Sequence, residues 1–343
     1  MTYTDFIETL RRNSDETARN YGTTIRTVAS AFGKAPDEIL TDIKTGKLDL
    51  IQFFRQMMTW SSQQNHRTNT TRYHLSVWIQ FLRYEGVKVD RDDVKTQVRP
   101  PKTIRTFGGR PFTREELTKI LDIVNLKYRT MILLGATSGM RAGEIGALRV
   151  GDIDFSKSPV EILVHGETSK SGRDRDTFCS DEAATHLKSF IGEGKTKNDF
   201  IFTMEEGKRF TSNAVSVATA RILARAKIRE KNGNAPRHTL SFHSLRKYFT
   251  THMVQEGVPL PIVELLCGRE IGVTQSYLMP TQDKMRKYYA DTMQKMVLTQ
   301  APVDLERLVD SRIAERDAVI QQLQDRLSKL EVIYTKQMDI KAE

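Results

Sequence analysis

Four short segments in the second half of the chain hold charged and aromatic residues at spacings that could support chemistry at a phosphate. The segments are GMRAGEIGALR (139–149), ETSKSGRDRD (167–176), SFHSLRKYFTTHM (241–253) and LLCGREIGVTQSYLMP (265–280). Their candidate catalytic residues are Arg141, Lys170, His243, Arg246, Arg269 and Tyr277, with Glu144 in support. Arg141 and Glu144 are three residues apart, as are His243 and Arg246, so each pair can share one helical face.

These residue types suit phosphoryl transfer at a DNA backbone phosphate. A tyrosine phenol is a weak nucleophile at neutral pH, but it can form a covalent phosphodiester. Two arginines can neutralise the charge that gathers on the nonbridging oxygens, because their planar forks match phosphate oxygens. A lysine or histidine can protonate the leaving 5′ oxygen. Since the arginines can supply the positive charge, we expect neither a metal nor another cofactor.

Each of these features also has an ordinary structural interpretation when it is taken alone. An Arg-x-x-Glu pair is usually a solvated salt bridge on a helix, and a lysine in a turn is usually just exposed. Tyr277 alone is more often a half-buried packing residue. Tyr288 and Tyr289 are rival nucleophiles for which packing or contact with the DNA backbone is the better interpretation, and Tyr248 is most simply a core residue. The order, spacing and local sequence of the four segments together favour a catalytic site.

Together the segments resemble the tyrosine recombinase (phage integrase) family, whose catalytic residues follow the order Arg, Lys, His-x-x-Arg, His or Trp, Tyr. GMRAGEIGALR resembles the family motif SG-x-R-x-x-E-x-x-x-L, TSKSGRDRD its lysine-bearing β-hairpin, FHSLRKYFTTHM its H-x-L-R-[HK] helix, and LLCGREIGVTQSY its L-L-G-H…T-x-x-Y segment. The resemblance covers residues 113–297, and residues 1–95 resemble the family's helical core-binding domain more loosely. It implies that the candidate residues named above take the family's catalytic roles, with Tyr277 as the nucleophile.

One position departs from the family pattern. Arg269 stands where the family usually has histidine or tryptophan, and it precedes Tyr277 by eight residues instead of the more common nine. Some archaeal viral integrases are similar in having an arginine there. An arginine can hydrogen-bond a phosphate, but its high pKa makes it a poor acid. Lys170 or His243 must then transfer the proton, and we expect Lys170 to be the main general acid.

Hydrophobic periodicity predicts a mainly α-helical fold with a small β-hairpin or sheet in the catalytic domain. The predicted domains are a helical DNA-binding domain (1–95), a basic linker (96–112), a catalytic domain (113–297) and a C-terminal helix (303–343). In the first domain Ser14 is a candidate N-cap, and helical segments are predicted at 48–60 and 70–86. The catalytic domain is predicted to begin with a capping box at Thr113 and Glu116.

The rest of the catalytic domain alternates helical segments with one hairpin. Residues 160–167 and 176–180 read as its strands, with Lys170 in the turn. Helices are predicted at 127–139, 181–190, 211–229, 243–256 and 259–267.

The chain carries a formal charge of +10, which suggests a polyanionic partner such as nucleic acid. The basic side chains that we expect near flanking phosphates are Lys102, Arg105, Arg110, Arg221, Arg225, Lys227, Arg229 and Lys231. Each of them singly is also explained as part of a solvated surface. Cys179 and Cys267 form no zinc or CxxC spacing, and no signal peptide or membrane span is recognisable, so we expect an intracellular, nucleoid-associated protein.

The segment 303–343 reads as one long helix with an apolar seam at heptad spacing, which includes Ile313, Ile320 and Leu327. It fits a short coiled coil of about three heptads and fits equally well a single amphipathic helix packed on its own domain.

The resemblance implies a site-specific recombinase that closes around duplex DNA as a C-shaped clamp. It cleaves and rejoins DNA through a 3′-phosphotyrosyl intermediate, with four protomers on two sites. Two alternatives remain open from the residues: a type IB topoisomerase-like enzyme that uses much the same residues, and a catalytically inactive DNA-binding or assembly protein.

Overall fold

The computed structural model describes residues 2–103, 109–169, 171–204, 207–229, 238–269 and 280–296, together with Leu298, Gln321 and Gln324. The chain divides into two compact units, Met1–Phe107 and Gly108–Glu343. The described residues are mainly helical, with one small antiparallel sheet in the second unit, so the predicted fold class is confirmed. None of the described helices is long and apolar enough to cross a membrane.

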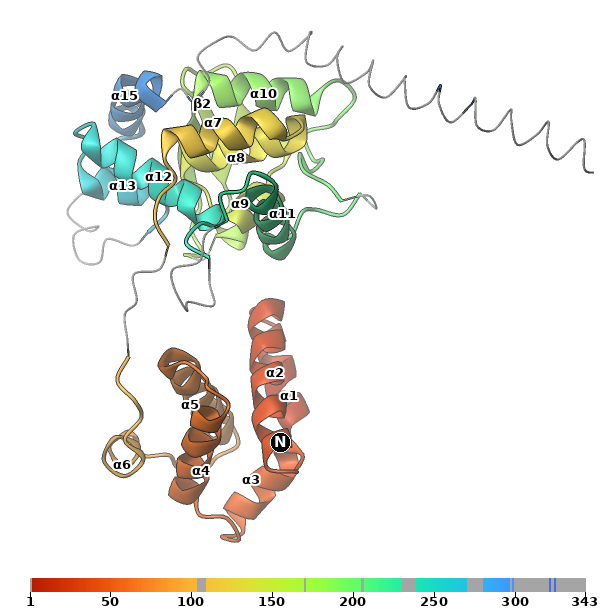
Figure 1. Cartoon of the computed structure of the whole chain (residues 1–343), viewed down its shortest axis with the longest axis vertical. Coiled ribbons are helices and arrows are strands. Elements are labelled where there is room, and N and C mark those ends of the chain that lie inside the picture. Colours follow the sequence, from red (N-terminus) through yellow and green to blue (C-terminus); the bar gives the residue numbers. More distant parts are fainter. Residues whose placement is uncertain are drawn as a thin grey trace, which may run out of the picture. The chain divides into compact units, whose positions relative to one another are not determined.

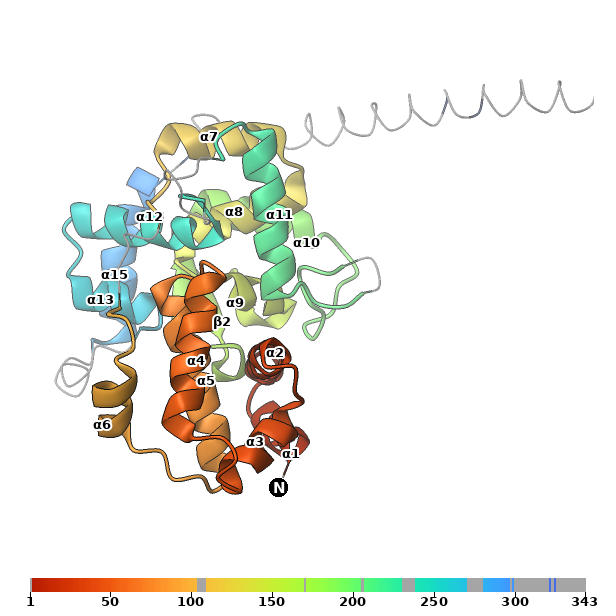
Figure 2. The same ribbon diagram turned by 60° about the horizontal axis from the view of Figure 1, so that its bottom comes forward.

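Among its described residues, the first unit contains helices and loops but no strand. Its helices are α1 (Tyr3–Arg11), α2 (Asp15–Ala31), α3 (Pro36–Lys44), α4 (Leu50–Gln63), α5 (Thr68–Tyr84) and the short α6 (Arg91–Asp93). Ser14 caps α2 as predicted, because its hydroxyl accepts a hydrogen bond from the backbone N–H of Thr17 at 3.2 Å. Helices α4 and α5 lie side by side (Figure 2), with the rings of Phe53 and Trp78 packed edge to face at 5.0 Å between them.

The first unit ends in a π-helical turn, η1 (Val94–Val98), that directly follows α6. Val94 and Val98 are buried in the apolar core of this unit. The helical turn therefore runs past residue 96, where the sequence pattern placed the start of the linker, because these two valines have a core to pack into. Residues 99–103 form neither helix nor strand.

The second unit is built around a buried helix. Its helices are α7 (Arg114–Ile123), α8 (Leu126–Ser138), α9 (Ala142–Ala147), α10 (Asp181–Ile191), α11 (Ser212–Arg225), α12 (Phe242–Gln255), α13 (Leu260–Leu266) and α15 (Gln282–Met293). In α8 every residue from Arg129 to Ser138 is buried, as expected of a helix that is covered on all sides. Helices α10 and α12 pack against it (Figure 1), so α8 forms the centre of the unit.

The sheet contains β1 (Ile153–Asp154), β2 (Val160–Val164) and β3 (Arg175–Cys179) in the order β1-β2-β3. Strands β2 and β3 pair antiparallel, with Val164 opposite Arg175 at the end that leads into the turn. The predicted hairpin is thus present, and Lys170, which was predicted in its turn, lies outside the described residues. The predicted capping box is also confirmed, since Thr113 Oγ accepts from the N–H of Glu116 at 3.2 Å and Glu116 accepts from the N–H of Thr113 at 2.9 Å.

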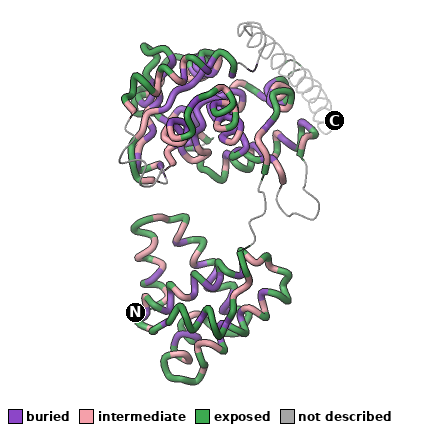
Figure 3. Tube along the Cα trace, turned by 90° about the vertical axis from the view of Figure 1, so that its left-hand side faces the viewer, coloured by how far each residue is buried: buried purple, intermediate pink, exposed green. Residues whose placement is uncertain are grey.

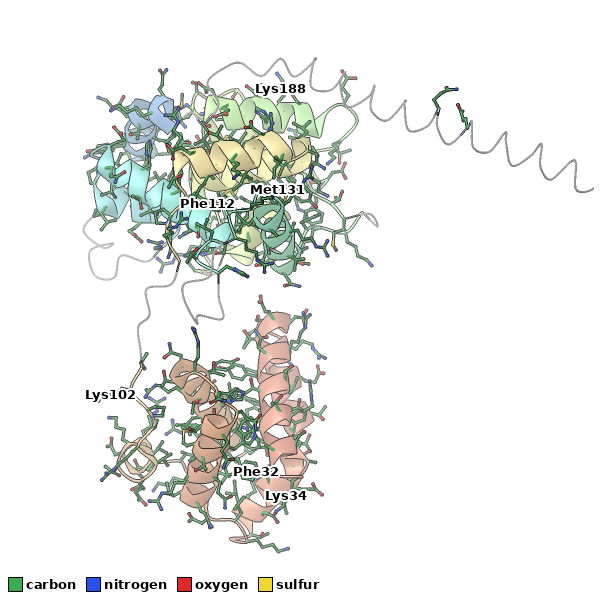
Figure 4. The ribbon with its side chains drawn as sticks, viewed as in Figure 1. Phe32, Lys34, Lys102, Phe112, Met131 and Lys188 are labelled. Carbon is green, nitrogen blue, oxygen red and sulfur yellow. The ribbon has the colours of Figure 1, made fainter. Side chains whose placement is uncertain are left out.

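Each unit has its own apolar interior, with the buried positions inside it (Figure 3). In the second unit Phe112 enters the core just before α7, and Met131 enters it from α8 (Figure 4). Apart from Gln321 and Gln324, the predicted C-terminal helix lies outside the described residues, so its coiled coil stays a prediction.

Candidate active site

A tight turn after α8 positions the first arginine motif. Gly139 ends α8 with a left-handed φ of 65°, and a Cβ at this position would lie 2.5 Å from Phe249 and 2.9 Å from the sulfur of Cys267. Only glycine combines this φ with this close approach at little cost. The turn places Arg141 at the N-cap of α9, where its backbone N–H donates to Glu144 Oε2 at 2.8 Å.

The carboxylate of Glu144 is held by two arginines. Arg141 Nη1 donates to Oε1 at 2.7 Å, while Arg175 Nη1 and Nη2 donate to Oε1 and Oε2 at 3.2 and 2.7 Å. Burial disfavours the charge of Glu144, but the hydrogen bonds from Arg175 and Arg141 outweigh it and hold its pKa below the ordinary value. Glu144 is therefore a buried anion at neutral pH.

The second arginine comes from α12 and is fully buried. Arg246 is 1% exposed, and its Nη1 donates to Gly139 O at 2.9 Å, which joins α12 to the turn that carries Arg141. Its Nη2 is also buried and has no hydrogen-bond partner among the described residues. Burial lowers the pKa of Arg246 to about 10, and the nearby charges of Arg141 and Arg269 act in the same direction. The guanidinium remains charged at neutral pH, with a donor unused.

His243 lies one helical turn before Arg246, at the first turn of α12. Its ring reaches solvent, yet desolvation by the surrounding protein lowers its pKa, and the cations of Arg246, Lys247, Arg269 and Arg141 lower it further. The imidazole is therefore neutral at pH 7 and can accept or donate a hydrogen bond there.

Arg269 follows α13 and is held by a carboxylate on that helix. Its Nη1 donates to Glu264 Oε1 at 2.6 Å, and its backbone N–H donates to Glu264 O at 2.9 Å. The preceding carbonyl, Gly268 O, accepts from Arg141 Nη2 at 3.3 Å. The end of α13 is thereby attached to the first arginine motif.

The structure thus brings five of the predicted site residues into one cluster: Arg141, Glu144, His243, Arg246 and Arg269. Lys170 and Tyr277 lie outside the described residues. Four positive or potentially positive groups, Arg141, His243, Arg246 and Arg269, lie near one another, an arrangement suited to binding an anion with its charge spread over several oxygens.

The rival tyrosines are positioned for packing. Tyr289 is 0% exposed, its hydroxyl donates to Thr137 O at 2.8 Å, and burial raises its pKa well above the ordinary value. Tyr288 is partly buried against the same apolar cluster. Tyr248 is a core residue, as predicted, stacked on His252 with ring centroids 5.6 Å apart. A buried phenol with a raised pKa cannot readily act as a nucleophile.

Comparison with known proteins identifies the family. The family model described as "Phage integrase family" matches residues 110–284. This chain belongs to the phage integrase family. The match spans the arginine motif, the hairpin, the His-x-x-Arg helix and the segment that holds Arg269 and Tyr277.

Named relatives agree with this membership. The chain is 28% identical over 294 residues to "Tyrosine recombinase XerD" of Ralstonia nicotianae, covering 82% of this chain and 88% of the relative. It is 26% identical over 209 residues to "Tyrosine recombinase XerA" of Pyrococcus horikoshii, covering 60% and 68%. This integrase family member is a site-specific tyrosine recombinase, an enzyme that cleaves and rejoins DNA.

Solved structures show the same fold at lower identity. A lambda integrase(75-356) dimer bound to a COC' core site has a TM-score of 0.55 and 17% identity, covering 84% of this chain and 94% of that one. The Tn1549 transposon integrase in complex with circular intermediate DNA has a TM-score of 0.52 and 16% identity, covering 84% and 98%. These likenesses concern the fold alone.

The basic residues expected near DNA differ in their surroundings. Arg110 is not free, because its guanidinium pairs with both oxygens of Glu116 at 2.7 and 2.6 Å and so fastens the start of the catalytic unit. Exposed candidates are Lys102, Arg221, Arg225, Lys227 and Arg229. Lys102 lies near the end of the first unit (Figure 4). Arg105 and Lys231 are outside the described residues.

Arg175 is the site residue that the sequence reasoning missed. The predicted turn ended at residue 174 and the predicted return strand began at residue 176, so Arg175 was assigned to neither. In the structure β3 begins at Arg175, whose side chain is 9% exposed and pairs with Glu144. A positive residue on a strand, opposite the apolar Val164, is the signal that could have indicated an internal carboxylate partner.

Proposed function

We propose that this recombinase cleaves one DNA strand by attack of Tyr277 on a backbone phosphate. The phenolic oxygen forms a bond to phosphorus, and the bond from phosphorus to the 5′ oxygen breaks. The phenol gives up its proton as it attacks, and the leaving 5′ oxygen takes up a proton, so the products are a 3′-phosphotyrosyl link and a free 5′-hydroxyl. Attack by the 5′-hydroxyl of a partner strand reverses the step and releases Tyr277, so the energy of the broken bond is kept in the link.

The observation that carries this proposal is the buried Arg246 with its unused Nη2 beside Arg141. A buried, charged donor with no partner is costly to the fold, and a phosphate oxygen would satisfy it. In our proposal Arg141 and Arg246 bind the two nonbridging oxygens and stabilise the charge that develops there. Arg269 and His243 add hydrogen bonds to the same phosphate, and Glu144 orients Arg141.

We assign the leaving-group proton to Lys170. Arg269 has too high a pKa to serve as an acid, and His243 is neutral at pH 7 with a lowered pKa. Lys170 lies between the two hairpin strands in the sequence, and in our proposal it approaches the 5′ oxygen when DNA is bound.

A nicked suicide substrate tests the nucleophile, because loss of the short cleaved strand traps the covalent adduct. We expect peptide mapping to place the adduct on Tyr277, and Tyr277→Phe to abolish it while DNA binding persists. Tyr288→Phe is the matched control and should still form the adduct. An adduct on Tyr288 or Tyr289 contradicts the proposal. DNA binding with no adduct would indicate an inactive binding protein, and relaxation of supercoils without recombination would indicate a topoisomerase-like enzyme.

A substrate with a 5′-bridging sulfur tests the acid. Its thiolate leaving group needs no proton, so it should restore cleavage by Lys170→Ala but not by Arg141→Ala. Equal failure of both variants on this substrate would remove Lys170 from the acid role.

We further propose that residues 1–95 act as a core-binding domain and 113–297 as the catalytic domain, with four protomers on two duplex sites inside the cell. The exposed basic residues of α11 and its C-terminal end, such as Arg221 and Arg225, would contact flanking phosphates.

Residues 301–343 hold seven basic and nine acidic side chains, so direct phosphate binding is not their role. Deleting 303–343 should leave single-site cleavage intact and weaken self-association, as sedimentation of both proteins would show.

A further inference from the structure

Arg175 makes contact with two segments that the sequence separates widely. It is the first residue of β3, five positions after Lys170, and its side chain is 9% exposed. The two Nη atoms form a fork on Glu144, which belongs to the arginine motif. Its Nε donates to Leu266 O at 3.1 Å, at the end of α13. All three nitrogens of the guanidinium are therefore used inside the protein.

Gly268 completes this junction. Its φ is 64°, and a Cβ there would lie 2.7 to 2.8 Å from three atoms of the Arg175 guanidinium. The carbonyl of the same glycine accepts from Arg141 Nη2. Arg175 therefore packs directly on the backbone that leads into Arg269 and, eight residues later, to Tyr277. Hairpin, arginine motif and α13 meet at one buried guanidinium.

The fork determines how Glu144 faces Arg141. Each carboxylate oxygen accepts one bond from Arg175 and one from Arg141: Oε1 from the two Nη1 atoms, Oε2 from Arg175 Nη2 and the Arg141 backbone N–H. Rotation of the carboxylate would break all four bonds. A lysine cannot reproduce this geometry, because its ammonium is a point charge without a planar fork.

We propose that Arg175 is a positioning residue for DNA cleavage: it orients Arg141 through Glu144 and joins the Lys170 hairpin to the segment that carries Arg269 and Tyr277. The inference rests on the function proposed above for Arg141, Lys170 and Tyr277. Arg175 itself need not touch DNA, since its nitrogens are already bonded within the protein.

The charges around Glu144 predict how the loss of Arg175 would change the pH dependence of cleavage. The cations that face the carboxylate are Arg141, Arg175 and, more distantly, Arg246, whose own neighbours include Cys267 and Arg269. Without Arg175 the burial of Glu144 is less opposed, so its pKa rises. Arg141 is then correctly oriented only at a pH where Glu144 is ionised, and cleavage gains a dependence on pH that the wild type lacks.

The experiment compares Arg175→Met, Arg175→Lys and the matched control Arg173→Met, which removes an exposed arginine from the same hairpin. Single-turnover cleavage of the suicide substrate is measured at saturating protein across the neutral range. We expect the cleavage rate of Arg175→Met to fall about 10- to 100-fold, by analogy with the loss of residues that orient metal ligands, and to recover partly as the pH rises. The cleavage rate of Arg175→Lys should lie between those of wild type and Arg175→Met, because lysine keeps the charge without the planar fork. Arg173→Met should keep the wild-type profile.

Thermal unfolding without DNA separates positioning from a failure to fold, and it needs no cleavage activity. The stability difference between wild type and Arg175→Met should grow as pH rises through the carboxyl range, because only ionised Glu144 gains from the fork. In a Glu144→Gln background, the stability difference caused by Arg175→Met should not grow with pH. If Arg175→Met cleaves like wild type with an unchanged pH profile, the positioning role is wrong. That result leaves the Tyr277 adduct in wild type as a separate test of the proposed function.

Discussion

Two buried arginines in the second unit differ in their hydrogen-bond partners. Arg129 on α8 is 7% exposed and directs Nε and Nη2 at Leu121 O, at 3.2 and 2.6 Å. That carbonyl belongs to the last turn of α7, where backbone acceptors lack helical partners. Arg246 on α12 is 1% exposed, bonds Gly139 O through Nη1 alone, and keeps Nη2 without a partner among the described residues.

Both arginines are buried, so the depth of burial does not separate a structural charge from one that we propose binds a phosphate, whereas their partners do. Arg129 completes the end of a helix. Burial lowers the pKa of Arg246, and the like charges of Arg141 and Arg269 nearby lower it further. Such a cluster destabilises the free protein and becomes favourable when an anion enters, which is the behaviour expected of a binding site.

The largest effect on cleavage is expected at Arg246. Arg246→Ala should lower single-turnover cleavage at least ~100-fold, the scale of losing a transition-state hydrogen-bond donor. Removal of the repelled charge offsets part of the lost bond to Gly139 O, so the free energy of unfolding should fall less than in Arg129→Met. Near wild-type cleavage by Arg246→Ala would refute its role at the phosphate. Arg129→Met is the matched control, and its folded fraction should cleave at the wild-type rate.

A smaller effect on cleavage is expected at Gly268, whose backbone contacts the Arg175 guanidinium. Gly268→Ala should reduce cleavage roughly 10-fold, because the new Cβ displaces Arg175 and with it the orientation of Arg141. Gly257→Ala is the control: Gly257 also has a positive φ, 86°, but a Cβ there meets nothing within 4 Å. It should cost about 1 kcal/mol of stability and leave cleavage unchanged. Equal activity of the two variants would show that the contact at Gly268 does not matter.

At Arg129 the expected effect is on stability. Arg129→Met should lower the free energy of unfolding by about 2 kcal/mol, the range for losing hydrogen bonds from a buried charged donor. Urea unfolding of wild type and variant measures it. A variant as stable as wild type, but impaired in cleavage, would reverse the roles assigned to the two arginines.

The smallest expected effect is a pH dependence of the stability, which arises from the buried residue His186. His186 is 3% exposed, and burial lowers its pKa, while Nδ1 bonds Glu182 O at 2.9 Å. Its folded pKa lies below the unfolded one, so the unfolded chain binds the proton first. Stability should therefore decline as pH falls below about 6.5. His186→Gln should weaken that decline in thermal unfolding, and an identical decline in both proteins would exclude His186 as a source.

The sequence by itself determined what depends on neighbours along the chain. The Ser14 cap, the Thr113–Glu116 capping box and the pairing of Arg141 with Glu144 each join residues three apart, and helix geometry brings such residues together wherever the helix forms. The helical fold class follows in the same way from hydrophobic periodicity. Motif order indicated candidate catalytic residues without any knowledge of their packing.

Only the tertiary structure decided which distant groups meet. Arg175 reaches Glu144 across 31 positions and Arg246 reaches Gly139 across 107. Tyr289 is withdrawn into the core by a bond to Thr137, 152 positions away, although by sequence it looked like a rival of Tyr277. A basic or phenolic residue has the same local pattern whether it faces DNA or an internal partner, because that choice is made by the packing of segments that the chain brings together from far apart.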